Sequence, residues 1–323
     1  MEKKNEKLKI AFVIGQFPTI SETFIINQVA DLMDRGIEVE IFSFNKGVKE
    51  SISERYYDYK MDKLTHNLNM PGNFLARFLK AIPKIIKLLV CNPRALLAAL
   101  NFRHYGRNAY SLKLIYWCEP WLGKKFDMVH CHFGTIANKF LIIREILGIR
   151  EKFITTFYGI DVSAVIKNKP ADYYDKLKKE CLLFFVMSNN MKERVAAIGF
   201  PVEKIKVLPI SIDVDKYPFS ERKLKAGERV EIISVGRFVE KKGFDDLLRA
   251  LAIVKKKTDK SFKCTIIGGG PLEKELYRLT KVLNLNDVVD YKGYMKIEEI
   301  IKYFQNMHLY VQPSKTARNG DME

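Results

Sequence analysis

The sequence predicts an α/β fold made of two domains. Its 323 residues exceed the usual length of one domain about twofold. Short apolar runs that end at glycine are repeatedly followed by amphipathic runs, the pattern of parallel strands joined by helices. A polar, irregular stretch at 210–228 separates two such regions. We therefore expect an N-terminal domain over 1–209, a linker over 210–228 and a C-terminal domain over 229–323.

Composition and charge narrow the class of protein. Hydrophobic residues make up 47% of the chain, but no apolar run approaches the ~20 residues of a membrane span. The mostly charged start leads directly into a strand pattern, so no signal peptide is expected. Five scattered cysteines without C-x-x-C spacing indicate reduced, cytoplasmic thiols. The net charge of +17 indicates an anionic partner, and a membrane surface or phosphorylated substrate fits better than nucleic acid.

The N-terminal region begins with a β-α-β pattern. Residues 8–14 are typical of a buried strand that ends at Gly15, and 37–44 alternate as a second strand. Between them, Thr19 and Glu22 have the spacing of a capping box, which predicts the start of a connecting helix. This unit opens a Rossmann-like layer, although the loop lacks the G-x-G-x-x-G of dinucleotide-binding proteins.

Residues 74–90 form the most amphipathic segment of the sequence. Four basic side chains recur along it at helical spacing: Arg77, Lys80, Lys84 and Lys87. Such a stripe is either the solvated face of a helix packed on the core or a surface that binds anionic headgroups. Both interpretations stay open, and the second predicts a contact with an anionic membrane surface through 74–90.

Metal-binding patterns are weak throughout the sequence. His130 and His132 would share one face of a strand, but no third ligand accompanies them. Asp213 and Asp215 form a D-x-D pair in the linker, outside the apolar strand context in which such a pair binds a metal. We therefore expect no metal site.

In the C-terminal region, residues 232–235 are typical of a buried parallel strand. Gly236 and Arg237 follow it, and Lys242 precedes an amphipathic helix that begins at Phe244. Ligands of open α/β sheets bind at the carboxyl ends of the strands, and cations beside a helix amino terminus suit a phosphate. A solvated basic loop is the alternative.

A second loop in this region carries three glycines, Gly268 to Gly270, directly after strand 263–267. A glycine loop after a strand is a weak signal for nucleotide binding. Glu273 stands where a dinucleotide site has a third small residue, which opposes binding of a dinucleotide.

These motifs together resemble family 4 glycosyltransferases of the GT-B fold, most of all the colanic-acid type that builds exopolysaccharide repeat units. The likeness extends over essentially the whole chain, and the motifs of the C-terminal region are the most specific. The matching segments are F-P-T-I-S-E-T-F-I (17–25), H-C-H-F-G (130–134), T-F-Y-G-I-D (156–161), V-G-R-F-V-E-K-K-G-F (235–244), G-G-G-P-L-E (268–273) and P-S-K-T-A-R-N-G-D-M-E (313–323).

The resemblance implies two Rossmann-like domains whose parallel sheets face each other across a cleft. It implies a retaining transfer from a nucleotide-sugar without a bound metal or other cofactor. Arg237 and Lys242 would hold the donor diphosphate, Gly15 would let the backbone approach it, and Tyr294 would lie near the base. The expected donor-binding residues are Gly15, Arg237, Lys242, Gly268, Gly270 and Tyr294.

The catalytic residues that the resemblance implies are Tyr158, His132 and Glu323. Many members of the family carry His at the position of Tyr158, where it contacts the donor sugar, whereas Tyr is a poor base at neutral pH. His132 would serve the acceptor side or be a buried structural histidine. Glu323 would be the first of two paired glutamates. Because the second is missing, we expect an incomplete C-terminal domain and an inactive 323-residue chain.

The function that follows from the resemblance is hexosyltransferase-type transfer in exopolysaccharide or cell-surface polysaccharide biosynthesis. The expected acceptor is a lipid-linked glycan or oligosaccharide, and the expected location is the inner face of the membrane, as a peripheral protein. A non-catalytic sugar-nucleotide or polysaccharide-binding relative is the alternative that Tyr158 and the missing glutamate favour. The absence of the G-x-G-x-x-G fingerprint argues against an NAD-dependent oxidoreductase. The sequence leaves open the donor sugar, its base, the linkage and the oligomeric state.

Overall fold

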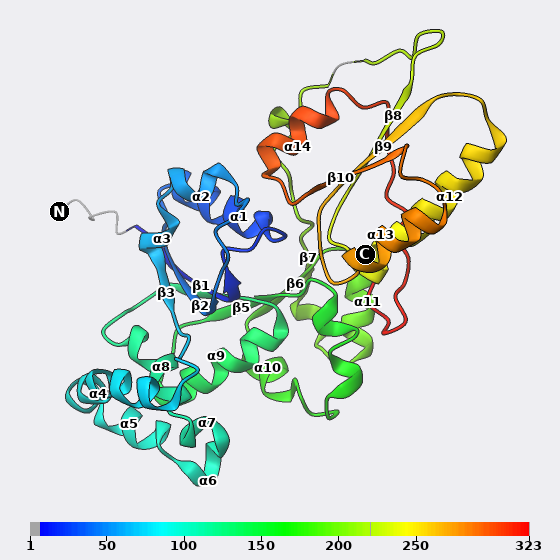
Figure 1. Cartoon of the computed structure of the whole chain (residues 1–323). Coiled ribbons are helices and arrows are strands. Elements are labelled where there is room, and N and C mark those ends of the chain that lie inside the picture. Colours follow the sequence, from blue (N-terminus) through cyan, green and yellow to red (C-terminus); the bar gives the residue numbers. More distant parts are fainter. Residues whose placement is uncertain (1–6, 220, 323) are drawn as a thin grey trace. The chain divides into compact units, whose positions relative to one another are not determined.

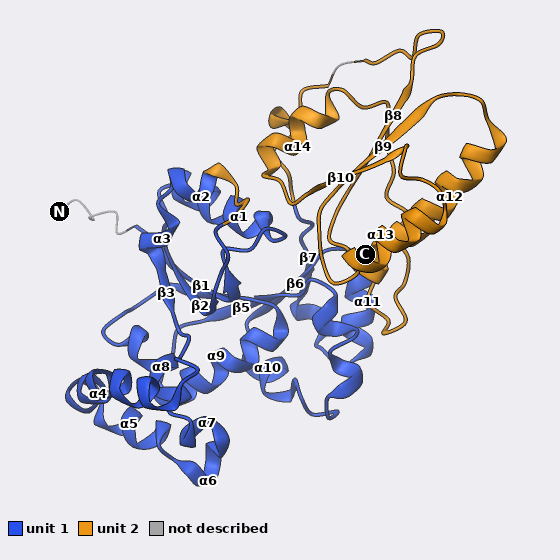
Figure 2. Ribbon diagram, in the orientation of Figure 1, with its two compact units in different colours: residues 1–49, 55–210 blue, residues 50–54, 211–323 orange. Residues whose placement is uncertain are grey.

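In the computed structural model, which describes residues 7–219 and 221–322, the chain divides into two compact α/β units. Unit 1 is built from 1–49 and 55–210, and unit 2 from 50–54 and 211–323 (Figure 2). Each unit has a parallel sheet of its own (Figure 1). The prediction of an α/β fold with two parallel sheets is confirmed.

Unit 1 holds, within the described residues, a seven-stranded parallel sheet in the order β3-β2-β1-β4-β5-β6-β7. The order reverses between β1 and β4, and in such sheets ligands bind beyond the carboxyl ends of the strands at this point. The strands are β1 (Lys9–Phe17), β2 (Glu38–Lys46), β3 (Thr65–Asn67), β4 (Met128–His132), β5 (Phe153–Thr156), β6 (Leu183–Val186) and β7 (Ile205–Val207).

Helices cover this sheet and bury its apolar side chains. Helix α1 (Thr23–Asp34) contacts β2, α9 (Gly134–Leu147) contacts β1, β4 and β5, and α11 (Asn189–Ala197) contacts β6 and β7. Shorter helices are α2 (Glu54–Asp58), α3 (Met61–Leu64) and α10 (Asp175–Glu180). The largest fully buried side chains of unit 1 are aromatic: Phe12, Phe42, Phe140, Phe153, Phe157 and Phe184.

A helical layer connects β3 to β4. It consists of α4 (Phe74–Cys91), α5 (Pro93–Ala99), α6 (Phe102–Tyr105), α7 (Arg107–Tyr110) and α8 (Lys113–Cys118). Helices α5 and α8 contact α9, while α4 contacts α5 and α8, so α4 lies on the outside of the layer (Figure 1). No helix in the described part of the chain combines the length and the hydropathy needed to cross a membrane.

Two local predictions at the start of unit 1 are wrong. Strand β1 does not end at Gly15, because its pairing with β2 continues as far as Phe17 and Lys46. The predicted capping box is absent. Helix α1 begins at Thr23, its N-cap residue Glu22 makes no capping hydrogen bond through its side chain, and the buried hydroxyl of Thr19 has no partner within the described residues. The longer strand delays the turn, which carries Thr19 away from the helix start.

Unit 2 has, within its described residues, a four-stranded parallel sheet in the order β10-β9-β8-β11. The order reverses between β8 and β11. The strands are β8 (Val230–Val235), β9 (Phe262–Ile267), β10 (Val289–Gly293) and β11 (Leu309–Tyr310), and the helices are α12 (Phe244–Lys257), α13 (Glu273–Val282) and α14 (Ile297–Phe304). Leu248 of α12 and Leu276 of α13 pack in one apolar cluster, and Ile300 of α14 packs with Ile233 and Ile267 in another.

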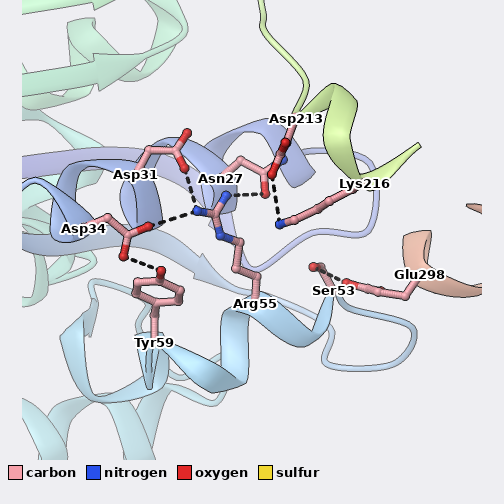
Figure 3. A network of polar contacts seen from close by, with 9 residues as sticks. All are labelled: Asn27, Asp31, Asp34, Ser53, Arg55, Tyr59, Asp213, Lys216 and Glu298. Carbon is pink, nitrogen blue, oxygen red and sulfur yellow. Dashed lines mark hydrogen bonds and ion pairs between the residues drawn. The ribbon is translucent and has the colours of Figure 1, made fainter. Parts of the chain in front are cut away.

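Arg55 fastens α2 to α1 within unit 1 (Figure 3). Its Nη2 atom lies 2.6 Å from Asp31 Oδ1 and 3.3 Å from Asp34 Oδ2, and its Nη1 atom donates to Asn27 Oδ1 at 3.3 Å. The guanidinium therefore pairs with two carboxylates on one face of α1. The Tyr59 hydroxyl also donates to Asp34 Oδ1 within unit 1. The two remaining interactions drawn there belong to unit 2: Ser53 with Glu298, and Asp213 with Lys216.

Glu40 joins three basic side chains at the amino-terminal ends of the strands in the unit 1 sheet. Its carboxylate lies 2.6 Å from Lys9 Nζ, 2.7 Å from His66 Nε2 and 2.5 Å from Lys124 Nζ. Burial alone would raise the pKa of Glu40, but the hydrogen bonds from Lys124, Lys9 and His66 outweigh it and lower the pKa to about 2. Glu40 therefore stabilises the fold in its ionised form.

Replacing Glu40 by Gln is expected to lower the free energy of unfolding of unit 1 by about 1–3 kcal/mol at pH 7. Because the folded pKa lies below the unfolded value of ~4.3, the ionised carboxylate stabilises above that value and loses its effect as the pH falls toward 2. The difference between wild type and variant should therefore shrink between pH 5 and 2.5.

Both tryptophans of the sequence, Trp117 and Trp121, lie in unit 1, so their fluorescence during denaturation reports on that unit. Glu38→Gln, at an exposed carboxylate of the same strand, is the matched control. Equal stabilities of the Glu40→Gln and Glu38→Gln variants at pH 7 would contradict the assignment.

Candidate active site

The carboxyl end of β8 presents two cations in unit 2. Arg237 follows the strand after Gly236; it is exposed, and its guanidinium has no hydrogen-bond or ion-pair partner within the described residues. Lys242 folds back over the strand end, with its Cδ and Cε atoms 3.5 and 3.6 Å from the position that a Cβ at Gly236 would take. The start of α12 follows directly, and its first backbone N–H groups favour a bound anion.

The glycine loop after β9 packs backbone to backbone on this strand end. A Cβ at Gly268, where φ is +141°, would lie 1.9 Å from the carbonyl oxygen of Gly236. A Cβ at Gly270, where φ is +150°, would lie 2.9 Å from the amide nitrogen of Phe238. The Phe238 amide also donates to the carbonyl of Gly269 at 2.8 Å. Glycine is therefore required by the close approach of two loops.

Tyr294, which follows β10, closes the same edge. Its hydroxyl donates to the carbonyl of Gly269 at 2.8 Å, and its ring lies against that glycine, since a Cβ there would be 2.7 Å from the ring. The structure thus brings five of the six predicted donor-binding residues together on adjacent strand ends of unit 2: Arg237, Lys242, Gly268, Gly270 and Tyr294.

A brace that the sequence analysis missed holds the Lys242 loop. Gln312 Nε2 donates to the carbonyl of Lys242 at 2.8 Å, and a Cβ at Gly243 would lie 1.9 Å from the carbonyl oxygen of Pro313. Lys315 Nζ lies 2.8 Å from carboxylate oxygens of both Asp245 and Asp246 in the first turn of α12.

Lys241 Nζ and Asp321 Oδ2, 3.3 Å apart, add a further ion pair to this brace. The sequence feature that could have indicated the brace is the P-S-K motif at 313–315, which entered only through the family resemblance. Glu323, which was expected to contact the donor sugar, lies outside the described residues.

In unit 1, the predicted catalytic residues gather at the ends of β4 and β5. His130 and His132 lie on one face of β4, with ring centroids 4.2 Å apart, as predicted. His132 Nδ1 lies 2.8 Å from the hydroxyl oxygen of Tyr158, and His130 Nε2 lies 2.7 Å from Thr156 Oγ1. No group of three potential metal ligands occurs among the described residues.

Burial sets the charge state of this cluster. It lowers the pKa of His130 to about 4, and burial together with the proximity of His130 holds the pKa of His132 well below its ordinary value, so both rings are neutral at pH 7. Burial also raises the pKa of the Tyr158 phenol, which stays protonated. His132 is fully buried while Tyr158 is half-buried, so Tyr158 is the outer member of the pair.

Asp161 ties the Tyr158 loop to the start of α9. Its Oδ2 accepts from the Gly134 amide at 2.8 Å, and its Oδ1 accepts from the amides of Tyr158 and Gly159 at 3.2 Å each. Burial raises the pKa of Asp161 to about 6, an effect only partly offset by these amide donors. The T-F-Y-G-I-D motif therefore encodes a buried carboxylate that positions Tyr158.

Replacing Asp161 by Ala is expected to cost unit 1 about 3 kcal/mol or more of unfolding free energy, because buried amides lose their acceptor at ~1–3 kcal/mol each. Tryptophan fluorescence during urea denaturation measures this. Asp172→Ala, at an exposed carboxylate nearby, is the control and should shift the transition by less than ~0.5 kcal/mol. A loss no greater than that of the control would show that Asp161 does not hold the loop.

Gly15, the sixth predicted donor-binding residue, lies within β1 of unit 1. Asn45 Nδ2 donates to its carbonyl at 3.2 Å, and a Cβ would lie 3.2 Å from Ile136 Cδ1 of α9. The close approach of α9 to the strand therefore explains why residue 15 is a glycine, without reference to a bound phosphate.

Comparisons with known proteins agree with this architecture. The family model "Glycosyl transferases group 1" matches residues 215–320. The putative colanic acid biosynthesis glycosyltransferase WcaL of Escherichia coli K12 is 30% identical over 320 residues, which are 98% of this chain and 78% of the relative. The amylovoran biosynthesis glycosyltransferase AmsK of Erwinia amylovora is 31% identical over 331 residues, with the same coverage.

Solved structures show the same fold at low sequence identity. HepE of Anabaena, crystallised with UDP and glucose, superimposes with a TM-score of 0.62 at 13% identity, covering 96% of this chain and 75% of that one. WaaG, a glycosyltransferase involved in lipopolysaccharide biosynthesis, gives 0.55 at 11% identity, covering 95% and 75%. The fold is that of the GT-B glycosyltransferases. With its relatives at 30% identity over nearly its whole length, the chain belongs to the group 1 glycosyltransferases and is a transferase.

Proposed function

We propose that this protein transfers a hexose, with retention of configuration, from a nucleoside-diphosphate sugar to a lipid-linked glycan in exopolysaccharide or cell-surface polysaccharide biosynthesis. The observation that carries the proposal is the position of Arg237, which has no side-chain partner among the residues that the structure describes, beside Lys242 and next to the glycine loop. The relatives support the pathway, since two of them are described as colanic acid and amylovoran biosynthesis enzymes.

The donor side follows from charge. A diphosphate gains negative charge as its bond to the sugar breaks, and preorganised cations stabilise that charge most effectively. Arg237 and Lys242 supply two such cations, so the proposed reaction uses no bound metal. Gly268 and Gly270 let the glycine loop pack against the strand end that carries Arg237, and Tyr294 offers an exposed aromatic ring for the base.

The sugar contact in unit 1 follows from the Tyr158–His132 pair. When His132 Nδ1–H donates to the phenol oxygen, the phenol proton is free to donate to a bound sugar. The Nε2 atom of the neutral ring, which has no partner among the described residues, then carries no proton and needs no acceptor. In this proposal Tyr158 contacts the sugar as a hydrogen-bond donor, and His132 positions it from behind.

The proposed site of action is the inner face of the membrane, with the enzyme bound peripherally where lipid-linked acceptors are found. The net charge of +17 supports an anionic surface as partner. Because Lys84 and Lys87 pair with Glu119, other residues of the 74–90 segment would make that contact.

The test is a transfer assay with purified protein whose chain extends beyond Glu323, radiolabelled sugars and extracted lipid-linked acceptors. UDP- and GDP-sugars are both included, because HepE was crystallised with UDP and a mycobacterial relative is described as GDP-mannose-dependent. The expected result is transfer from at least one donor, with the donor's anomeric configuration preserved in the product by NMR. Binding of every donor without transfer would indicate a non-catalytic relative, and inversion would refute the retaining mechanism.

A further inference from the structure

Helix α4 exposes an apolar face to the outside of unit 1. Eight large apolar side chains of this helix are between 40% and 77% exposed, and we call them the outer face of α4. Their spacing of three and four residues places most of them along one side of the helix. They are Phe74, Leu75, Phe78, Leu79, Ile82, Ile86, Leu89 and Val90.

The basic stripe of this helix is turned toward the protein instead. Lys84 Nζ and Lys87 Nζ each lie 2.6 Å from the carboxylate of Glu119. Arg77 donates from Nε to the carbonyl of Pro71 at 2.9 Å. Three of the four cations that were expected to face a membrane therefore have partners within unit 1, and Lys80 alone of the four is left exposed without one among the described residues.

The sequence around the outer face lacks acidic residues altogether. Residues 63–118 contain no Asp or Glu. Four exposed cations of α4 to α7 have no ion-pair partner in the part of the chain that the structure describes: Lys80, Arg94, Arg103 and Arg107. The carboxylates that contact this layer come from outside it: Glu119 holds Lys84 and Lys87, and Glu145 of α9 pairs with His104.

We propose that the outer face of α4 inserts into the interfacial region of an anionic lipid bilayer. A contiguous apolar face of this size is unusual on a protein surface that stays in water. A second copy is a poorer occupant, because a twofold contact would bring the same cations together with no carboxylate to offset them. The helix is too short and too charged to cross a membrane, so it lies in the interface plane, with Lys80 and the exposed arginines of α5 to α7 at the headgroups.

This inference names the surface through which the proposed transferase meets its lipid-linked acceptor. It replaces contact through the basic stripe by insertion of apolar side chains. Vesicle binding requires no donor sugar, so failure of the inference leaves the transfer reaction untouched.

The first experiment measures co-flotation of the full chain with vesicles of phosphatidylglycerol and phosphatidylcholine. Wild type is expected to bind them at least about tenfold better than phosphatidylcholine alone. The double variant Leu79→Glu/Ile82→Glu is expected to reduce binding at least about tenfold, because each change removes an apolar side chain that would insert into the bilayer and adds a negative charge. Ile253→Glu, at an exposed apolar residue of α12, should bind like wild type.

The second experiment distinguishes insertion from surface attraction. Trp117 and Trp121 are each 5% exposed and provide a constant background, so a Phe78→Trp variant reports on the outer face. Its added fluorescence is expected to shift to the blue and to be quenched by acyl chains brominated near the headgroup, while Tyr277→Trp on α13 is not. The proposal would be overturned by unquenched emission at position 78, or by wild type binding neutral and anionic vesicles equally. It would also be overturned if the Leu79→Glu/Ile82→Glu variant bound vesicles like wild type, or if wild type formed a dimer that the Leu79→Glu/Ile82→Glu changes abolish.

Discussion

Replacing Arg237 by Ala is expected to lower turnover about 10²-fold or more, because one preorganised donor to a developing anion contributes about that much. Arg237 has no partner to lose among the described residues, so the variant should fold like wild type, and the whole effect should appear in binding and catalysis. Nucleoside diphosphate should bind more weakly by ~1.5–3 kcal/mol, the usual value of a charge-assisted hydrogen bond. Initial rates and isothermal titration calorimetry measure the two quantities.

Arg249→Ala is the matched control for this change. Arg249 is also an exposed arginine of unit 2, but it lies on α12, away from the strand ends. It removes the same net charge from the same unit, so a general electrostatic effect would weaken binding in both variants. Unchanged turnover in Arg237→Ala, or an equal loss in both variants, would contradict the assignment of Arg237 to the diphosphate.

Replacing Gly268 by Ala is expected to destabilise unit 2 by about 3–5 kcal/mol and to weaken nucleotide binding by at least about tenfold. The added Cβ would lie 1.9 Å from the carbonyl oxygen of Gly236, so one of the two loops must move. Moving either one displaces Arg237 from the glycine loop. Circular dichroism during denaturation reports on both units, and tryptophan fluorescence isolates unit 1.

Gly293→Ala separates the clash from backbone strain. Gly293 also has a positive φ, +69°, but a Cβ there meets no atom within 4 Å. It should therefore cost only the ~1–2 kcal/mol of a left-handed conformation. If Gly268→Ala proves no more costly than Gly293→Ala, the two loops do not pack as described.

Unit 2 was largely predictable because its signals are local. Each signal is a short stretch of sequence: the strand ends at Gly236 and Gly268, the cations between 237 and 242, and the helix start at Phe244. Parallel topology then places the carboxyl ends of the strands at one edge of the sheet. The brace from 312–321 was missed because it depends on contacts some 70 residues apart, such as that between Lys315 and Asp245. Periodicity carries no information about such contacts.

In unit 1 the errors have a common origin in tertiary contacts. Amphipathicity predicted α4, but which side of it faces the protein depends on Glu119, which lies directly after α8 and outside the layer. Helices α5 to α8 are short, and α5, α7 and α8 are held by residues buried in the layer, which periodicity does not reveal. The pairing of His132 with Tyr158 joins residues 26 positions apart, and the sequence proposed a role for each without linking them.

The brace on the Lys242 loop has a consequence for synthesis of the protein on the ribosome. Strand β8 lies between β9 and β11, and Gly243 is packed against Pro313. A nascent chain emerges from its amino terminus, and domains fold as their residues become available. Unit 1 can therefore complete its sheet while the Lys242 loop of unit 2 still lacks the partners that fix it. We expect this loop to acquire its final conformation only after residues 312–315 have left the exit tunnel, so that competence to hold a nucleotide arises late in translation.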